Sequence, residues 1–327
     1  MEALKTLKSR YHVPSAEDSL AGRLWRSATR RHVPSFPRTV QFETHSVCNA
    51  ACVFCPYPGA IESQPKGRMT PELFEKIVEE MARHGVRRIS PYLNNEPFLD
   101  PEMVHRIREI HRRIPEAKIV LTTNGSRLDD KTVDGLLEVD ALHALYISFQ
   151  GMDKVGYEAA MRGSLVFEET LASVENLIDK WKAAGGEKRF RIVLTMVATN
   201  LIDTHKSVAF WRSKGVESKW TPLENRGGDI AIAPALVPDH KPLRRFTNCT
   251  RLFKQAYILW NGDMVLCCTD YTRKVVLGNV AETSIREVWT SPMAVQMRRL
   301  YSEGLMDRIP LCKDCQICDL TGDEELE

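Results

Sequence analysis

Short apolar runs alternate with longer amphipathic segments over most of the chain. The amphipathic segments have the three-to-four-residue spacing of helices, and the short runs between them are typical of strands. Six strand–helix units predict an α/β fold, with a parallel sheet that is either doubly wound or curled into a barrel. The six expected strands are TVQFE (39–43), RRISPYL (87–93), KIVLTT (118–123), ALYISF (144–149), RIVLTMV (191–197) and SKWTPL (218–223).

Several expected helices have clear start and stop signals. Thr70 and Pro71 predict an N-cap and first helical residue, and Gly85 predicts the end of that helix. Asp100 followed by Pro101 predicts the start of the next one in the same way. The helix expected over 167–184, ending before Gly185, carries an apolar stripe on one face: Leu171, Val174, Leu177, Ile178 and Trp181.

The pattern changes beyond about residue 245. The run AYILWNGDMVLCC (256–268) predicts a hairpin turning at Asn261-Gly262, and Ser284 with Glu287 forms a capping box that opens a helix. We therefore expect three parts: an N-terminal basic extension (1–37), an α/β core (38–243) and a small C-terminal hairpin-plus-helix domain (244–327).

Composition narrows the class of protein. Hydrophobic residues make up 43% of the 327 residues and charged residues 27%, as in ordinary globular proteins. No apolar run is long enough to cross a bilayer, and the first ten residues, MEALKTLKSR, lack the apolar stretch of a secretory signal. A net charge of +2 does not indicate a nucleic-acid or membrane partner. We expect a cytoplasmic protein.

The nine cysteines fall into two groups. Three lie in the stretch CNAACVFC, directly after the first expected strand, and six lie beyond residue 248. In a cytoplasmic chain such groups predict metal ligands rather than disulfides, and their separation predicts two metal centres. The cysteines are Cys48, Cys52, Cys55, Cys249, Cys267, Cys268, Cys312, Cys315 and Cys318.

Three closely spaced cysteines favour an iron–sulfur cube over zinc. Thiolates hold such a cube at one iron each, so three of them leave the fourth iron open to bind a small molecule. Structural zinc sites are closed and tetrahedral, which normally takes four ligands.

The spacing Cys48-x3-Cys52-x2-Cys55, with the aromatic Phe54 before the last cysteine, resembles the radical S-adenosylmethionine (radical SAM) superfamily. The resemblance runs from about residue 38 to 223 and implies a partial (β/α)6 TIM-like barrel. It further implies that SAM binds the open iron of a [4Fe–4S] cluster and is cleaved to a 5′-deoxyadenosyl radical. A flavodoxin- or ferredoxin-type protein would supply the electron.

Further strand ends match the family's SAM-binding positions. The family usually has Gly-Gly-Glu-Pro after its second strand, where this chain has Asn-Asn-Glu-Pro (94–97), so the resemblance assigns Asn95 and Glu96 to the SAM amino group. It assigns Asn124, in Thr-Asn-Gly (123–125), to the third strand end. Ser148 and Arg162 resemble the pair that holds the SAM carboxylate, a group that an arginine fork suits.

The C-terminal cysteines resemble the SPASM, or shortened twitch, domain that carries an auxiliary cluster in many radical SAM enzymes. The resemblance implies one auxiliary [4Fe–4S] cluster held by Cys249, Cys267, Cys312 and Cys315, which leaves Cys268 and Cys318 over. Cys267 and Cys268 are adjacent in an expected strand, so we expect their side chains on opposite faces. A structural zinc site is the alternative for this half.

Radical SAM enzymes with one auxiliary cluster include dehydrogenases, epimerases and peptide-modifying enzymes. We favour two-electron oxidation of an alcohol in a small polar, carbohydrate-like or aminocyclitol substrate, with Glu224 and Arg226 of LENRGGD (223–229) as candidate catalytic residues.

Three further classes of protein compete with this prediction. An epimerase would use the Cys268 thiol as hydrogen-atom donor. A peptide- or protein-modifying maturase would act on a polypeptide, and an RNA-modifying enzyme would bind its substrate through the basic N-terminal extension. A non-catalytic iron–sulfur protein is disfavoured, because it would not need the SAM-binding residues.

Overall fold

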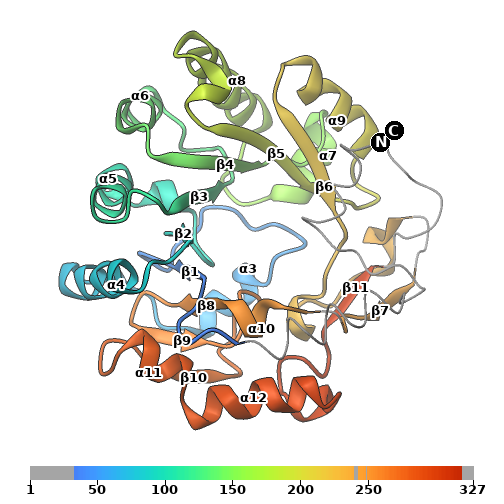
Figure 1. Ribbon diagram of the computed structural model, residues 1–327. Helices are drawn as coiled ribbons and strands as arrows, with labels where there is room; N and C mark the ends of the chain where they lie inside the picture. The colour runs from blue at the N-terminus through green and yellow to red at the C-terminus, as the bar shows by residue number, and fades with distance from the viewer. Residues whose placement is uncertain (1–32, 239–241, 248, 319–327) are drawn as a thin grey trace, which may run out of the picture.

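The computed structural model describes residues 33–238, 242–247 and 249–318, and its central feature is a curved parallel sheet (Figure 1). The six expected strands are all present and neighbour one another in chain order, which confirms the α/β architecture. Their bounds are β1 Thr39–Phe42, β2 Arg88–Ser90, β3 Lys118–Thr123, β4 Leu142–Ser148, β5 Arg191–Val197 and β6 Glu217–Thr221. The basic residues of the N-terminal extension, Lys5 to Arg31, lie outside the described residues.

Helices cover the outer side of this sheet, as a partial (β/α)6 barrel requires (Figure 1). These outer helices are α4 Pro71–His84, α5 Met103–Arg113, α6 Asp130–Val139, α8 Phe167–Ala183 and α9 Thr204–Ser213. Two shorter helices, α3 Tyr57–Ser63 and α7 Lys154–Met161, follow the carboxyl ends of β1 and β4. Side chains alternate along β4: Ile147 is buried towards α8, whereas Tyr146 and Ser148 are half-buried on the other face.

The predicted helix signals hold with one exception. Thr70 caps α4 by accepting a hydrogen bond from Leu73 N (3.2 Å), and Gly85 ends it in the left-handed region at φ 62°. The helix predicted at Asp100 begins three residues later, at Met103. The Asp100 carboxylate instead accepts from Glu102 N (3.2 Å) and pairs with Arg106 Nε (3.0 Å), so residues 101–102 form a turn.

The C-terminal part continues the barrel sheet. Strand β8 (Gln255–Ile258) lies parallel to β1, with Thr39 opposite Gln255, and β9 (Asp263–Val265) and β10 (Val276–Asn279) extend it antiparallel. The sheet thus has nine strands in the order β10-β9-β8-β1-β2-β3-β4-β5-β6. The predicted hairpin and capping box are present, but the domain boundary at 243/244 stays a prediction because the sheet runs across it.

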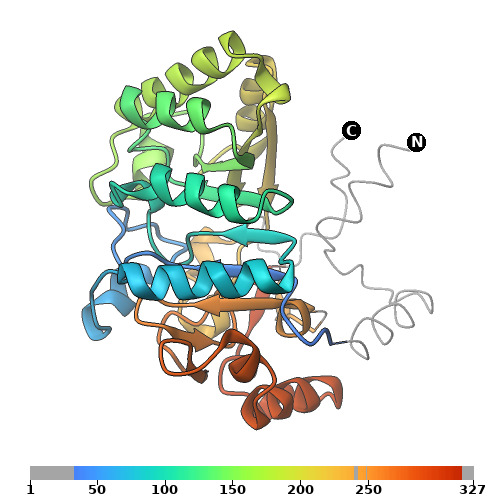
Figure 2. The same cartoon turned by 60° about the vertical axis from the view of Figure 1, so that its left-hand side comes forward.

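Short elements complete the C-terminal part and lie at the bottom and lower right of Figure 1. Strands β7 (Leu243–Arg245) and β11 (Gln316–Cys318) pair antiparallel. The helices are α10 Arg251–Lys254, α11 Ile285–Trp289 and α12 Pro292–Ser302, which pack near the start of the described chain (Figure 2).

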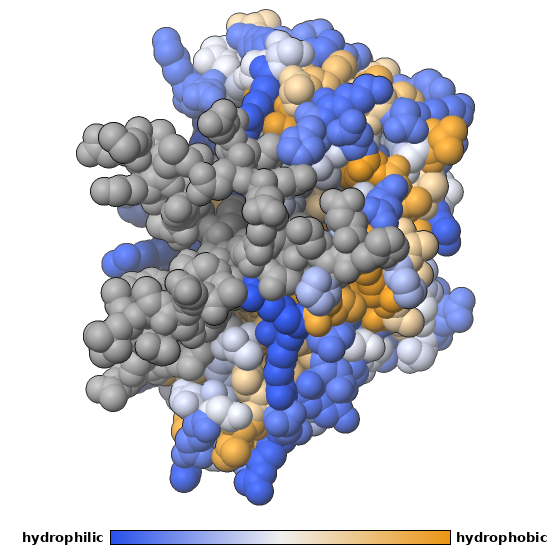
Figure 3. All heavy atoms as spheres, turned by 90° about the vertical axis from the view of Figure 1, so that its right-hand side faces the viewer, coloured by the Kyte–Doolittle hydropathy of each residue, from blue (hydrophilic) through white to orange (hydrophobic). Residues whose placement is uncertain are grey.

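The helices of the described residues can be compared with a membrane span in length and apolar character. None of those helices combines the length and apolar character that crossing a bilayer needs. In the coloured part of Figure 3, hydrophilic and hydrophobic side chains are interspersed over the face on the β6 side.

A buried carboxylate joins the barrel to the C-terminal helices. Glu80 of α4 accepts hydrogen bonds from the first backbone N–H groups of α11, those of Ile285 (2.8 Å) and Arg286 (2.9 Å). Glu80 is only 6% exposed. We expect Glu80→Ala to lower the free energy of unfolding by about 1–3 kcal/mol, because it leaves buried donors without an acceptor.

Chemical denaturation monitored by circular dichroism measures this loss. The matched control is Glu79→Ala on the same helix, which removes only the exposed pair with Arg83 and should cost at most about 1 kcal/mol. Equal losses in the two variants would contradict the capping role of Glu80.

Candidate active site

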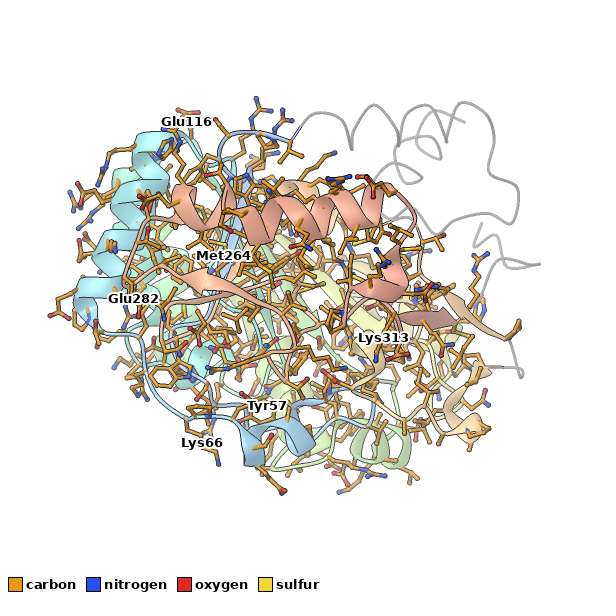
Figure 4. All side chains as sticks on the ribbon, turned by 90° about the horizontal axis from the view of Figure 1, so that it is seen from below. Tyr57, Lys66, Glu116, Met264, Glu282 and Lys313 are labelled. Atoms are coloured by element: carbon orange, nitrogen blue, oxygen red, sulfur yellow. The ribbon has the colours of Figure 1, made fainter. Side chains whose placement is uncertain are left out.

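The first cysteine group lies in the loop between β1 and α3, at the carboxyl end of the sheet. Figure 4 places Tyr57, which directly follows this loop, at the opposite end of the sheet from Glu116. Burial raises the pKa of Cys48 to about 12, and the nearby Glu96 carboxylate adds to the rise. Burial and the neighbouring Cys55 and Cys48 raise the pKa of Cys52 well above its usual range. Thiols with pKa values raised like those of Cys48 and Cys52 ionise readily only beside metal cations, which fits iron ligation.

Neighbouring segments hold the cysteine loop by backbone hydrogen bonds. One comes from the turn after β2, and the others come from the end of α7 and the residues that follow it. The bonds are Glu96 N to Val47 O (3.0 Å), Ala51 N to Met161 O (3.1 Å), Val53 N to Ala160 O (3.0 Å) and Ser164 N to Asn49 O (3.0 Å). Cys48 N also donates to the Tyr57 hydroxyl (2.7 Å), and Phe54 is buried beneath the loop. The spacing of the cysteines is therefore set by the barrel.

Asn95 and Glu96 lie in the turn after β2, where the resemblance placed them. The Glu96 carboxylate accepts hydrogen bonds from the Thr123 hydroxyl (2.6 Å), Asn124 N (2.7 Å) and Phe98 N (3.2 Å). Burial raises its pKa to about 7, against these hydrogen bonds. Asn95 is buried and accepts from Leu93 N (3.0 Å). An ammonium ion beside Glu96 would favour its ionised form, so the residue suits the predicted role.

The remaining predicted SAM-binding residues are only partly brought together. Asn124 donates to Asn49 Oδ1 (2.9 Å) and so ties the end of β3 to the cysteine loop. Ser148 is half-buried at the end of β4. Arg162 is exposed, and its Nε donates to Ala159 O (3.2 Å). No hydrogen bond joins Arg162 to Ser148 in the described part of the chain, so their shared carboxylate site stays a prediction.

The second cysteine group gathers where α10, the turn after β9 and the segment before β11 meet. Cys249 and Cys267 are buried, Cys312 and Cys315 are half-buried, and the charges of all four influence one another. The adjacent Cys268 thiol, with help from Arg251 and Thr269, lowers the pKa of Cys267 below its usual value despite its burial. A lowered pKa favours the thiolate form, so Cys267 suits the ligand role that its spacing predicts.

A single metal ion does not match either group in its present arrangement. Among the described residues, no three cysteine, histidine, aspartate or glutamate side chains converge on one point. Thiolates on an iron–sulfur cube bind different irons and are spread over its corners, so they need no such convergence. The donor sets, three thiols and four thiols, fit two cubes.

The expected position of Cys268 is wrong. Strand β9 ends at Val265, so Cys267 and Cys268 lie in the following turn, where strand alternation no longer applies. Their thiols hydrogen-bond to each other and thus lie on the same side of the chain. The interaction with Cys267, together with burial, raises the pKa of Cys268 well above its usual range.

Charged and polar side chains fill the space between the two cysteine groups. The Tyr271 hydroxyl lies 3.6 Å from Cys55 Sγ. Glu224 pairs through one oxygen with Arg226 Nη1 (3.3 Å) and through the other with Arg251 Nη2 (3.4 Å). The predicted catalytic residues Glu224 and Arg226 are thus together, whereas sequence reasoning missed Arg251 and Tyr271. The only local signal was that Arg251 comes two residues after a ligand cysteine.

A small pocket opens beside this region and is lined by both halves of the chain. Burial raises the pKa of Glu43, at the end of β1, to about 7. Glu43 Oε2 and Asn94 Oδ1 are buried without a hydrogen-bond partner among the described residues. Tyr57, Tyr271 and Arg273 complete the polar lining, so the pocket offers acceptors to a ligand rich in N–H and O–H groups.

The chain belongs to the radical SAM superfamily. The superfamily's model matches residues 42–196, and that of the SPASM iron–sulfur cluster-binding domain matches residues 249–318. These matches confirm the resemblance to the radical SAM superfamily and the resemblance to the SPASM domain. The protein is a radical SAM enzyme whose cofactors are SAM, the [4Fe–4S] cluster that binds it, and an auxiliary iron–sulfur cluster.

Several characterised proteins are similar over most of the chain. S-adenosyl-L-methionine-dependent 2-deoxy-scyllo-inosamine dehydrogenase of Niallia circulans is 24% identical over 289 residues, covering 88% of this chain and 96% of the relative. The crystal structure of BtrN with AdoMet and 2-DOIA aligns with a TM-score of 0.59 at 20% identity, over 85% of this chain and 92% of BtrN. Streptococcus suis SuiB bound to its precursor peptide SuiA aligns with a TM-score of 0.65 at 15% identity, over 91% and 78%.

Gly163 tests whether packing sets the geometry of the cysteine loop. It has φ 73°, and a Cβ there would lie 2.5 Å from Asn49 O and 2.9 Å from Ala51 N. We expect Gly163→Ala to push the loop away and to lower both iron binding at the first group and SAM cleavage. Gly85→Ala is the matched control, because Gly85 has φ 62° with nothing within 4 Å and so shares only the backbone strain. Equal iron contents in the two variants would refute the close-packing argument.

The two cysteine groups are separable by mutation. Replacing Cys48, Cys52 and Cys55 together by alanine should remove about four iron atoms and abolish reductive SAM cleavage. Replacing Cys249, Cys267, Cys312 and Cys315 should also remove about four, but it should leave SAM cleavage without product formation. Iron, acid-labile sulfide and 5′-deoxyadenosine are measured in anaerobically purified protein. Continued 5′-deoxyadenosine formation in the first variant, or unchanged iron in the second, would overturn the assignment.

Proposed function

We propose that this enzyme oxidises a secondary alcohol of a small polar substrate, of the aminocyclitol type, to a ketone. The similarity to 2-deoxy-scyllo-inosamine dehydrogenase over nearly the whole of both chains supports this reaction class. The structural similarity to BtrN supports the same arrangement of barrel and C-terminal part. The similarity to SuiB supports the fold alone.

The observation that carries the proposal is the chain of polar side chains that joins the two cysteine sets. Tyr271 contacts Cys55 of the first set, and Arg226 lies near both. Glu224 pairs with Arg226 and with Arg251, which contacts Cys267 of the second set. When bound, SAM and the two clusters supply the one-electron chemistry that removes a hydrogen atom and then an electron from the substrate carbon. The hydroxyl proton must pass to a base, for which the Glu224 carboxylate is the candidate. A substrate held by these side chains would lie between the two centres, which is the position that such an oxidation needs.

The side chains suit a substrate with hydroxyl and ammonium groups. Burial raises the pKa of Glu224, but the charges of Arg251 and Arg226 outweigh it and hold the pKa below its usual value. Glu224 therefore stays ionised and can accept a hydrogen bond from a substrate hydroxyl or ammonium group. Glu43 and Asn94 of the adjacent pocket offer further acceptors, so an amine-bearing polyol fits better than an apolar substrate.

The residue roles follow from the same assignment. Asn95 and Glu96 would hold the SAM amino group, Asn124 would support the loop beside it, and Ser148 and Arg162 would bind the SAM carboxylate after Arg162 moves. We also propose a flavodoxin- or ferredoxin-type electron donor and a reducing compartment, the cytoplasm.

Turnover in D2O distinguishes the dehydrogenase from an epimerase. With 2-deoxy-scyllo-inosamine as the first probe, followed by related aminocyclitols, we expect one 5′-deoxyadenosine and one two-hydrogen mass loss per turnover. We expect Cys268→Ala to retain this reaction, because the Cys268 thiol bonds to Cys267 rather than standing apart as a donor.

Deuterium in the substrate carbon, lost in Cys268→Ala, would instead establish an epimerase with Cys268 as donor. The absence of substrate-stimulated 5′-deoxyadenosine with every polyol tested would overturn the proposed substrate class. Loss of iron in Cys268→Ala would identify Cys268 as an auxiliary ligand.

A further inference from the structure

Arg251 has contacts that the proposed reaction does not explain. Its Nη1 lies 4.0 Å from Cys267 Sγ, within the range of a hydrogen bond to sulfur, and its Nη2 lies 3.4 Å from Glu224 Oε1. Arg251 thus joins a cysteine of the second set directly to the Glu224 carboxylate.

The position of the Arg251 guanidinium is well fixed. It lies over the Phe246 ring, with its central carbon 5.8 Å from the ring centroid, and Glu224 holds its other edge. Its side chain is 27% exposed and that of Glu224 is 19% exposed, so both charges act where water screens them only in part. A guanidinium is not deprotonated in proteins, so the cation is permanent.

Charges beside a cluster ligand act on the cluster's reduction potential. That potential depends on net charge, on hydrogen bonds to the sulfurs and on exposure to solvent. Reduction adds a negative charge, so a cation beside a ligand sulfur stabilises the reduced cluster and an anion destabilises it. Arg251 and Glu224 lie in series from Cys267 and therefore act in opposite directions.

We propose that Arg251 raises the reduction potential of the auxiliary cluster through Cys267, and that Glu224 limits this increase by neutralising part of its charge. In this proposal Arg251 acts on the cluster through Cys267 and does not touch the substrate. The inference rests on the proposed ligation by Cys249, Cys267, Cys312 and Cys315, and it deepens the proposed function because an electron acceptor works better at a higher potential.

The test is an anaerobic redox titration of the auxiliary cluster, followed by electron paramagnetic resonance. The Cys48/Cys52/Cys55→Ala protein serves as background, so only one cluster contributes to the signal. Arg251→Gln should shift the midpoint potential downwards, and Glu224→Gln should shift it upwards. Arg251→Lys keeps the charge, so its midpoint potential should lie between those of Arg251→Gln and the background protein.

Arg299→Gln is the matched control, because it also removes one positive charge from the C-terminal part. Arg299 pairs with Glu303 on α12 and its side chain is 76% exposed, so its loss should leave the potential unchanged.

The outcomes separate this inference from the proposals it rests on. Shifts of the same sign in Arg251→Gln and Glu224→Gln, or no shift in either, would overturn it. If Arg251→Gln fails to hold iron, the direction of the Glu224→Gln shift decides the question. Because no substrate is present in the titration, failure of the dehydrogenase proposal leaves the result intact. Loss of ligation would show as absent iron in the background protein.

Discussion

The structure depends on the hydrogen bonds that fix the cysteine loop to the barrel. A cluster requires three sulfurs at set positions, and a free loop of this length would lose much conformational entropy on binding one. Here the backbone of residues 47–53 is already bonded to the turn after β2 and to the end of α7. Asn124 adds a side-chain link from the end of β3. The barrel thus bears the entropic cost during folding, before any iron is bound.

The polar side chains between the two cysteine groups form the second constraint. Glu224 lies between Arg226 and Arg251, and such a partly buried triad rarely stabilises a fold, because removing charges from water costs as much as their attraction returns. An apolar filling would have been simpler to pack. Retention of three charges at this place is more readily understood from what they do to a bound substrate and to the neighbouring sulfurs.

The sequence predicted the features that depend on residues close to one another along the chain. The six strands, the Thr70 and Gly85 caps and the Ser284 capping box follow from local chemistry, and the structure contains all of them. The pairing of β8 with β1 was missed, since parallel pairing of Thr39 with Gln255 leaves no local signal. Arg251 and Tyr271 were missed for the same reason. The faces of Cys267 and Cys268 were wrong because β9 ends at Val265, and strand alternation cannot be extended into a turn.

The pairing of β1 with β8 has a consequence for synthesis on the ribosome. Strand β1 is synthesised before every other described strand. One of its two edges, however, pairs only with residues 255–258, which are made much later. Until those residues leave the exit tunnel, the barrel exposes an unpaired strand edge, the kind of surface at which nascent chains associate with one another. The C-terminal part therefore closes the edge of the barrel as well as carrying the second cluster. A chain interrupted before residue 255 would be an aggregation-prone fragment rather than a smaller enzyme.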